Sequence, residues 1–252
     1  MKAQVLAAVL VFAPASAWAQ GAIVETLEEL RAVPEPPETR GPMPEKVDLS
    51  SGIPPPRSQG ATSTCVSWAA TYAAASHALR RSGGNVTLSP AYTYNLVSGN
   101  RFCHVGTSIS KTLDFLRESG GLPIEEFAFD GGWCGRIPRD DERRRAQRYR
   151  IRGWSKFDAR DPVAVKVQLA RGVPVIFGMR IGAKLIGHRG DGVIEAVGEP
   201  FSGHAMVVVG YDDSRQAFRI QNSAGSGWGD RGYAWFAYRL WSETVQVGFV
   251  ID

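Results

Sequence analysis

Five short runs of β-branched and aromatic residues in the C-terminal third limit the fold of this chain more than any other feature. Gly, Asp and Ser separate the runs, and short runs bounded by such residues predict antiparallel strands. The expected strands are VPVIFGMRI, HAMVVVGYD, AFRIQNS, YAWFAYR and TVQVGFVI.

The segment before these strands is predicted to be helical. An Ala-rich stretch begins at Cys65, reads CVSWAATYAAASHALRR and stops at Gly83 and Gly84. Its apolar residues keep helical spacing, which indicates one buried face. We expect Ser63 or Thr64 to cap this helix.

Two further helices are predicted from their start signals. One covers residues 108–118 and is closed by two glycines, and the other covers 163–170, with Asp161 as its cap and Pro162 at its first position. A helical N-terminal lobe followed by a β-rich C-terminal lobe predicts an α+β protein. The natural place for chemistry is then a cleft between the lobes.

The first residues have the features of an export signal. Lys2 precedes an apolar run over 5–13, and small residues follow it. We interpret residues 1–19 as a signal peptide, cleaved after Ala19 or after Ala17. The run is too short for a stable membrane anchor. We therefore expect a soluble protein that is exported, either periplasmic or secreted.

Residues 20–47 are rich in Pro and Glu and are interpreted as a linker or a short pro-segment, with at most a short helix over 24–31. The sequence becomes globular after this stretch. We assign 48–252 to one domain, whose composition, 44% apolar over the whole chain, is ordinary for a folded protein.

The chain has three cysteines, an odd number for an exported protein. Cys103 and Cys134 lie in loop-like sequence rich in Gly and aromatic residues, whereas Cys65 opens a helix. We expect a disulfide between Cys103 and Cys134, because thiols pair in an oxidising compartment. Cys65 is then left as a free thiol.

The charge pattern argues against a nucleic-acid partner. The net charge is +4, and much of the excess is an arginine cluster over 139–152 that also holds acidic residues and lacks interleaved aromatics. We interpret it as a solvated face. His77, His104 and His188 show no metal-ligand spacing, and the glycines after Asn222 do not form a phosphate loop, so neither a metal nor another cofactor is expected.

Cys65 has the position of a catalytic nucleophile. A helix N-terminus and an adjacent imidazolium both lower the pKa of a thiol and favour the reactive thiolate. Gln59 precedes it in the loop RSQGATSTC and can fold its amide back toward the sulfur. With the backbone N–H of Cys65 it would form an oxyanion hole.

His204 and Asn222 supply the matching base and orienting group. His204 opens one predicted strand and Asn222 ends the next. Adjacent antiparallel strands bring these two ends together. An Asn oxygen that accepts from one ring nitrogen would fix the tautomer and aim the other nitrogen at the thiol.

The four residues occur in an order that resembles the papain-like cysteine peptidases over about 48–252. The matching segments are QGATSTCVSWA, LSPAYTYN, SGHAMVVVGYDD and FRIQNSAGSGWGDRGYAWF. The resemblance implies a two-lobed fold with an antiparallel, β-barrel-like C-terminal lobe. It also implies endopeptidase activity through a thioester acyl-enzyme, without metal or cofactor. Cys65 would be the nucleophile, His204 the general base and acid, Asn222 the orienting residue and Gln59 part of the oxyanion hole.

Three features depart from the family pattern. Val66 stands where Trp usually follows the nucleophile, and Trp68 comes two positions later. Ala224 replaces a Trp that usually shields the bond between the catalytic histidine and asparagine, unless Trp228 or Trp241 covers it. The long inhibitory prosegment of many members is also missing.

The resemblance further implies a substrate site around two loops, 106–108 and 199–203, with proteins or peptides as substrates. We expect the enzyme to be a monomer. The substrate-binding residues expected are Gly106, Thr107, Phe201, Gly203 and Trp228.

Two other functions fit the same residues. A catalytically silent papain-like binding protein would keep the fold, and Ala224 is the feature that favours it. An amidase for the stem peptides of the cell wall would share the Cys–His chemistry and the export.

Overall fold

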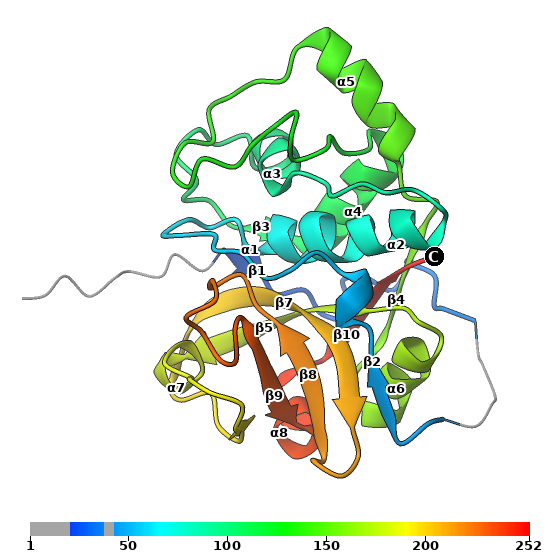
Figure 1. The fold of residues 1–252 in the computed structure, drawn as a ribbon, viewed down its shortest axis with the longest axis vertical. Coiled ribbons are helices and arrows are strands. Elements are labelled where there is room, and N and C mark those ends of the chain that lie inside the picture. The colour runs from blue at the N-terminus through cyan, green and yellow to red at the C-terminus, as the bar shows by residue number, and fades with distance from the viewer. Residues whose placement is uncertain (1–20, 38–42) are drawn as a thin grey trace, which may run out of the picture.

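A computed structural model describes residues 21–37 and 43–252, and it has two lobes stacked on each other (Figure 1). Helices form the upper lobe in this view, and a twisted sheet forms most of the lower one. The predicted signal peptide lies outside the described residues. The expectation of a two-lobed α+β fold is confirmed.

The central helical run extends from Cys65 to Arg81. It consists of α1 (Cys65–Ser67), η2 (Trp68–Ala75), where the turns widen to π-helical geometry, and α2 (Ser76–Arg81). Every residue of α1 and η2 is buried, so this run lies in the centre of the molecule and not at its surface.

The side-chain capping hydrogen bond expected at the start of this run does not form. Thr64 occupies the capping position, but its side chain makes no capping hydrogen bond. Its hydroxyl pairs instead with the hydroxyl of Thr62, at 2.7 Å. The Thr64 hydroxyl therefore bonds to a nearby side chain and not to a backbone N–H at the start of the helix.

The other helices of the upper lobe follow their start signals. Ser108 caps the predicted helix α4 (Ile109–Glu118). Ser89 caps α3 (Pro90–Ser98), a helix that the periodicity did not predict. The arginine cluster forms α5 (Asp140–Ala146) and the 3-10 turn η3 (Gln147–Tyr149), where Arg145 pairs with Asp141 at 2.6 Å.

The sheet has eight strands in the order β4-β10-β5-β7-β8-β9-β6, and β2 pairs with β7 outside this path. All pairs in it are antiparallel except the parallel pair of β6 and β9. The strands are β2 (Lys46–Asp48), β4 (Trp154–Asp158), β5 (Val175–Gly182), β6 (Val193–Ile194), β7 (Pro200–Asp212), β8 (Ala217–Gln221), β9 (Tyr233–Ala237) and β10 (Val247–Ile251).

Short helices flank the sheet. The predicted helix α6 (Pro162–Ala170) begins at Asp161, whose side chain accepts a hydrogen bond from the backbone N–H of Val163. The remaining helical elements are α7 (Ala183–Ile186), α8 (Tyr238–Thr244) and the 3-10 turn η1 (Ser50–Gly52).

Strand β7 separates two cores. Ala205 and Val207 belong to the apolar cluster that includes the central helix, whereas Met206 and Val208 belong to the cluster inside the β lobe. Side chains alternate between the faces of a strand, so one strand serves both cores. Burial of each large side chain contributes about 1.5–3 kcal/mol to stability. Because β7 contributes side chains to both apolar clusters, it joins the two lobes.

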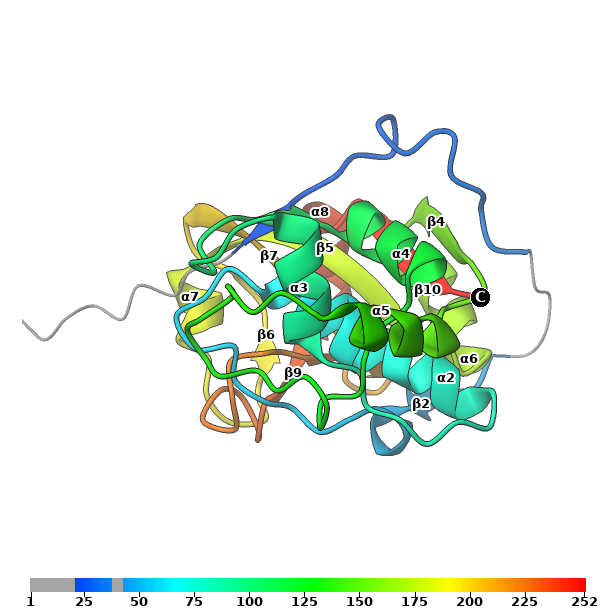
Figure 2. The ribbon, with the colours of Figure 1, turned by 90° about the horizontal axis from the view of Figure 1, so that it is seen from above.

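The N-terminal segment lies against the folded domain. Strand β1 (Ala22–Ile23) pairs in parallel with β3 (Thr107–Ser108). Turns follow over 27–32, so the short helix that the sequence allowed over 24–31 does not form. Seen from above, the segment runs outside the two lobes from β1 to the neighbourhood of β4 (Figure 2). There the carbonyl of Pro34 accepts from the backbone N–H of Lys156, at 3.0 Å.

Candidate active site

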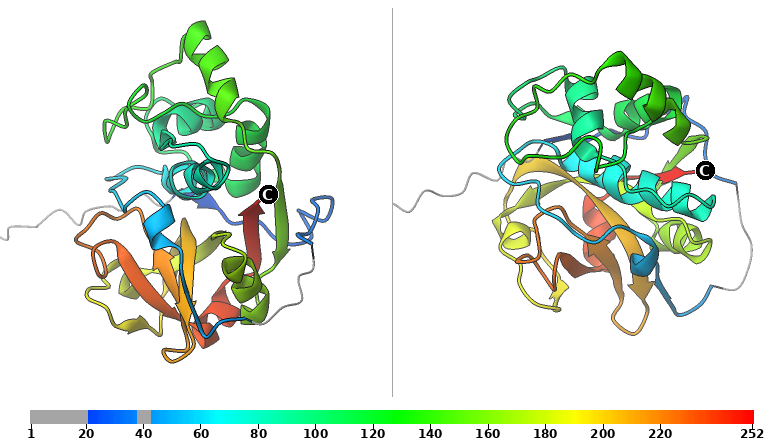
Figure 3. Two further views of the ribbon diagram at one scale, coloured as in Figure 1. Left: turned by 45° about the vertical axis from the view of Figure 1, so that its right-hand side comes forward. Right: turned by 45° about the horizontal axis from the view of Figure 1, so that its top comes forward.

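Cys65 is the free thiol at the start of α1. Two further views, one turned about the vertical and one about the horizontal axis, show the central helical run lying along the sheet at the junction of the lobes (Figure 3). The thiol has no solvent exposure. Burial raises its pKa, and backbone N–H groups of Gly21, Ala205 and its own helix start act in the opposite direction.

His204 lies on β7, next to Ala205. Its Nε2 is 2.7 Å from Oδ1 of Asn222, which follows β8. The same oxygen accepts from the backbone N–H of Ser223 at 2.8 Å, so it is an acceptor in both contacts. The proton of the neutral imidazole is therefore on Nε2, which donates to Asn222.

The other ring nitrogen is left available as a base. Among the residues that the structure describes, Nδ1 of His204 has no hydrogen-bond partner. The Ala205 amide next to it faces the thiol of Cys65, and Cys65 and Ala205 share one apolar cluster. The structure thus brings the predicted nucleophile, base and orienting residue into one site at the lobe junction.

The electrostatics of the site favour a neutral pair in this conformation. Burial lowers the pKa of His204 to about 4, although the hydrogen bond with Asn222 raises it. Together with the raised pKa of Cys65, this keeps the sulfur as a thiol and the ring as neutral imidazole.

Gln59 is held between the loop before Cys65 and the end of β8. Its Oε1 accepts from the hydroxyl of Ser223 at 2.6 Å, and its Nε2 donates to the carbonyl of Thr62 at 2.5 Å. The Thr62 hydroxyl donates back to the carbonyl of Gln59 at 2.7 Å. These contacts fix the glutamine amide within the loop that precedes Cys65, and its expected approach to the sulfur stays a prediction.

Comparison with known proteins identifies the architecture. The sequence pattern of the papain family cysteine proteases matches residues 43–245. The chain belongs to the papain family.

The chain is similar to known cysteine proteases in sequence and in structure. Mouse cathepsin K is 25% identical over 209 residues, which are 80% of this chain and 62% of cathepsin K, so the chain spans less than two thirds of that relative. Xylellain, a cysteine protease from Xylella fastidiosa, has a similar structure with a TM-score of 0.81, 24% identity and coverage of 94% of this chain and 97% of xylellain. Procathepsin L 3 of Tenebrio molitor gives 0.74, at 18% identity, with 94% and 77% covered.

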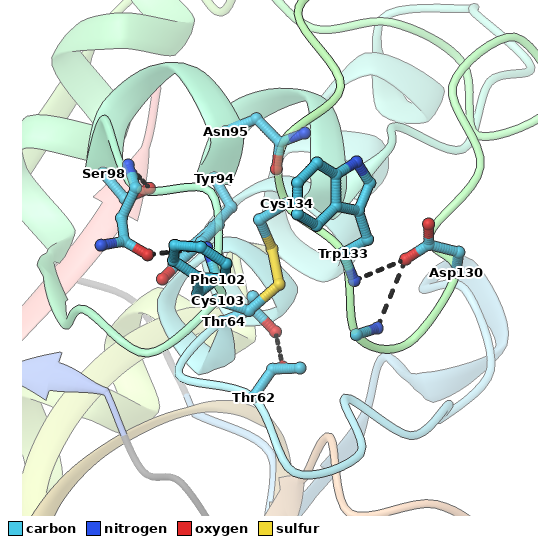
Figure 4. The surroundings of a disulfide bond; sticks show 12 residues. Thr62, Thr64, Tyr94, Asn95, Ser98, Phe102, Cys103, Asp130, Trp133 and Cys134 are labelled. Atoms are coloured by element: carbon cyan, nitrogen blue, oxygen red, sulfur yellow. Dashed lines mark hydrogen bonds between the residues drawn. A yellow bond between two sulfur atoms is a disulfide. The ribbon is translucent and has the colours of Figure 1, made fainter.

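This papain-family site is braced by a disulfide between Cys103 and Cys134 (Figure 4). The carbonyl of Cys103 accepts from the backbone N–H of Ser63 at 2.6 Å. Ser63 is two residues before Cys65, so the disulfide helps to hold the loop that presents the thiol. The expected pairing of the cysteines is the one that the structure forms.

The expected substrate residues fall into three groups. Gly106, Thr107 and Gly203 all lie against residues 21–22, at the junction of the lobes. Phe201 is 57% exposed nearby on β7. Trp228 does not fit the expectation, because it is 1% exposed and its indole N–H donates to the carbonyl of Leu185, at 2.9 Å.

Trp241 does not cover the bond between His204 and Asn222 either. Its ring packs on Phe177 and Phe218 inside the β lobe. The bond is buried nevertheless, since His204 is 2% and Asn222 5% exposed. Shielding of this bond therefore does not require a tryptophan at position 224.

No group of His, Cys, Asp and Glu side chains within 21–37 and 43–252 is arranged to hold a metal ion. Nor does this part contain a helix with the length and apolarity to cross a bilayer.

Proposed function

We propose that the chain is a cysteine-type endopeptidase that cleaves protein or peptide substrates through a thioester. One observation carries the proposal: the imidazole of His204 holds its proton on Nε2 against Asn222 and leaves Nδ1 as an unpaired base. This base lies in the same site as Cys65, a free thiol at a helix start. Membership of a cysteine protease family supports the same activity.

The proposed reaction begins with transfer of the thiol proton from Cys65 to Nδ1 of His204. The thiolate attacks the peptide carbonyl, and the oxyanion is stabilised by the Gln59 amide and the Cys65 backbone N–H. His204 then protonates the leaving amine, and a thioester remains. The neutral imidazole next activates a water molecule, which releases the acid and regenerates the thiol.

We further propose that the protein acts as a soluble monomer outside the cytoplasm, in the periplasm or secreted, after cleavage of residues 1–19. The Cys103–Cys134 disulfide supports this location, because such bonds persist in oxidising compartments. The catalytic domain would be 48–252.

No structural observation favours the silent binding protein. That alternative depended on Ala224 leaving the bond between His204 and Asn222 exposed to water, and both residues are buried. The cell-wall amidase is retained as an outcome of the experiment.

The test is treatment of the purified, reduced protein with an epoxide inhibitor of cysteine peptidases, read by intact mass, beside hydrolysis of an unfolded protein. We expect one adduct and proteolysis, both lost in Cys65→Ala. Turnover of peptidoglycan fragments without proteolysis would replace the endopeptidase with the amidase. A folded protein with reduced Cys65 that neither forms the adduct nor cleaves either kind of substrate would disprove both enzymes.

A further inference from the structure

The two loops that the disulfide joins carry exposed aromatic and apolar side chains on the helical lobe. Phe102 is 62% and Trp133 52% exposed, and each precedes one of the two bonded cysteines. Their rings meet edge to face, with the centroids 6.1 Å apart. Ile137, further along the second loop, is 64% exposed. Large apolar side chains that gather at one place on the surface are typical of a site that binds a partner.

The ring of Trp133 is held in its exposed position by its own loop. A Cβ atom on Gly135 would lie 2.2 Å from this ring, so the indole packs directly on the backbone of the glycine. Oδ1 of Asp130 accepts from the backbone N–H groups of Gly132 and Trp133, at 3.3 and 3.0 Å (Figure 4). A ring that is already fixed loses little conformational entropy when a ligand packs on it. We call Phe102 and Trp133 the aromatic ledge.

A pocket of about 270 Å³ lies directly beside the aromatic ledge. Gly135, on which the Trp133 ring packs, lines this pocket together with Cys134. Within the described parts of the chain, no acidic side chain lines it. Other lining residues come from α3, the turn after α3 and the segment that leads into α5, and they include Asn95, Asn100, Arg101, Arg136, Ile137 and Arg143. We call this space the arginine pocket.

The positive charge of the arginine pocket is only partly compensated. Arg136 pairs with Glu142 at 2.6 Å, and its guanidinium lies over the Phe127 ring. Arg143 donates from Nε to a backbone carbonyl at 3.3 Å, and the side chain of Arg101 is exposed. Neither of these two arginines forms an ion pair with another described residue. The pocket is therefore cationic, and guanidinium groups bind carboxylates through paired N–H groups.

One buried acceptor in the pocket has no hydrogen bond. Nδ2 of Asn95 donates to the carbonyl of Arg136 at 2.9 Å. Oδ1 of the same side chain is buried, and it has no partner among the residues that the structure describes. Buried polar atoms are normally hydrogen-bonded, so this oxygen points to a donor that a ligand brings. The pocket thus fits a ligand that combines an anionic group with an N–H donor, which is the chemistry of a peptide with an acidic side chain.

The aromatic ledge adjoins the loop that presents Cys65. The carbonyl of Cys103, next to Phe102, accepts from the backbone N–H of Ser63 at 2.6 Å. Phe102 also precedes Gly106, the first of the expected substrate residues, by four positions, so the chain between them spans at most about 14 Å. Neither the ledge nor the pocket contains a residue that was expected to bind substrate. They form a separate surface, close enough to the cleft for one long peptide to contact both.

We propose that the aromatic ledge and the arginine pocket form a second docking site for protein substrates, which binds an acidic peptide segment that also carries an apolar side chain. The acidic group binds Arg101 and Arg143, a backbone N–H donates to Asn95, and the apolar side chain packs on Trp133. The docking role rests on the proposed peptidase function, although binding itself needs no turnover. A substrate held here presents its other segments to the cleft at a raised effective concentration.

The first experiment measures binding alone. A fluorescein-labelled peptide in which glutamates flank a leucine is titrated with the Cys65→Ala protein, which cannot cleave it, and read by anisotropy. Arg101→Gln and Trp133→Ala are made in this protein. Arg144→Gln is the matched control, because Arg144 is exposed on α5 and lies outside the pocket. A peptide with glutamine in place of each glutamate controls for the charge of the ligand.

We expect Arg101→Gln and Trp133→Ala each to weaken binding at least about fivefold, and Arg144→Gln by less than about twofold. The glutamine peptide should bind at least about tenfold more weakly, and the affinity for the glutamate peptide should fall as salt is added. Equal weakening by Arg101→Gln and Arg144→Gln would overturn the pocket in favour of general charge attraction. Tighter binding of a sulfated oligosaccharide than of the glutamate peptide would overturn the peptide as the ligand.

The second experiment separates docking from catalysis in the enzyme that retains Cys65. Two fluorogenic substrates share one scissile sequence, and only the longer one carries the glutamate and leucine segment on a Gly/Ser linker. Arg101→Gln should raise KM for the longer substrate about fivefold, with kcat and the kinetics of the short substrate unchanged. No change in KM for the longer substrate would overturn the docking role and leave the peptidase intact. A protein that binds the labelled peptide but cleaves neither substrate would overturn the peptidase and retain the peptide-binding site.

Discussion

The two walls of the active site are built by different means. The wall that presents Cys65 is the loop 59–64, which is held by side-chain hydrogen bonds of Gln59 and Thr62 and by the carbonyl of Cys103. The opposite wall is the ladder of β7 and β8, where backbone pairs such as Val208 with Ile220 set the register. Single substitutions should therefore disturb the loop wall much more than the ladder wall.

The largest effect is expected at Gln59. Its side chain is both a proposed oxyanion donor and a structural link between Thr62 and Ser223. Gln59→Ala should lower kcat by about 10²–10³-fold, the usual loss for one oxyanion donor. Steady-state kinetics with a fluorogenic peptide would measure it. Ser223→Ala removes the link alone, and an equal loss there would show that Gln59 acts only through the loop.

The next largest effect is expected from removal of the disulfide that supports the loop wall. Replacing Cys103 and Cys134 together by serine opens a link over a sequence separation of 31 residues. For a loop of that size we expect a loss of about 3–4 kcal/mol in the free energy of unfolding. Urea denaturation measures it. A loss below about 1 kcal/mol would mean that hydrogen bonds, and not the disulfide, hold this wall.

The free energy of unfolding should depend on pH through His204, which lies on the ladder wall. The pKa of His204 is lowered to about 4 in the native protein, below its unfolded value of about 6.5. The unfolded state therefore binds the proton more readily. The stability that comes from the neutral ring is complete above pH 6.5 and is lost as the pH falls toward 4, by at most about 3 kcal/mol.

Denaturation curves between pH 7.5 and 4.5 would measure this loss. His204→Gln should flatten the dependence in that window. The pKa of Asp212 is lowered to about 2, so its contribution to the pH dependence of unfolding falls below this window. An unchanged slope in the variant would show that other groups cause the dependence.

The smallest effect is expected for the orienting residue. Asn222→Ala removes the acceptor for Nε2 of His204, but the backbone register of β7 still places the ring. A misaimed base should lower kcat by up to about 10²-fold, with little change in KM. The matched comparison is Asn222→Asp, which keeps an acceptor. A loss as large as that of Cys65→Ala would contradict the view that the ladder alone positions the base.

Much of the fold followed from local signals in the sequence. Ser108 and Asp161 marked the starts of two helices, and both cap them in the structure. The grouping of Cys65 with His204 and Asn222 followed from strand order. These predictions depended on residues close in sequence or on neighbouring strands, where the physical rules are strongest.

The failures involve contacts between distant residues. The short helix that the sequence allowed over 24–31 does not form, and the segment is held instead by pairing of β1 with β3 and by the contact of Glu25 with Ser110, which is 85 residues away. Trp228 was expected at the substrate, but its indole N–H is used by Leu185 inside the β lobe. No periodicity in a single sequence encodes such pairings.

The position of β10 in the sheet has a consequence for biogenesis. Within the described residues β4 pairs with no strand except β10, which inserts between it and β5. The ribosome therefore completes β4 long before the only strand that can bind it to the sheet has been made. The β lobe cannot close during synthesis, and pairing at such sequence separation is slow. The β lobe of this chain is therefore completed only when the last of its described strands has been made.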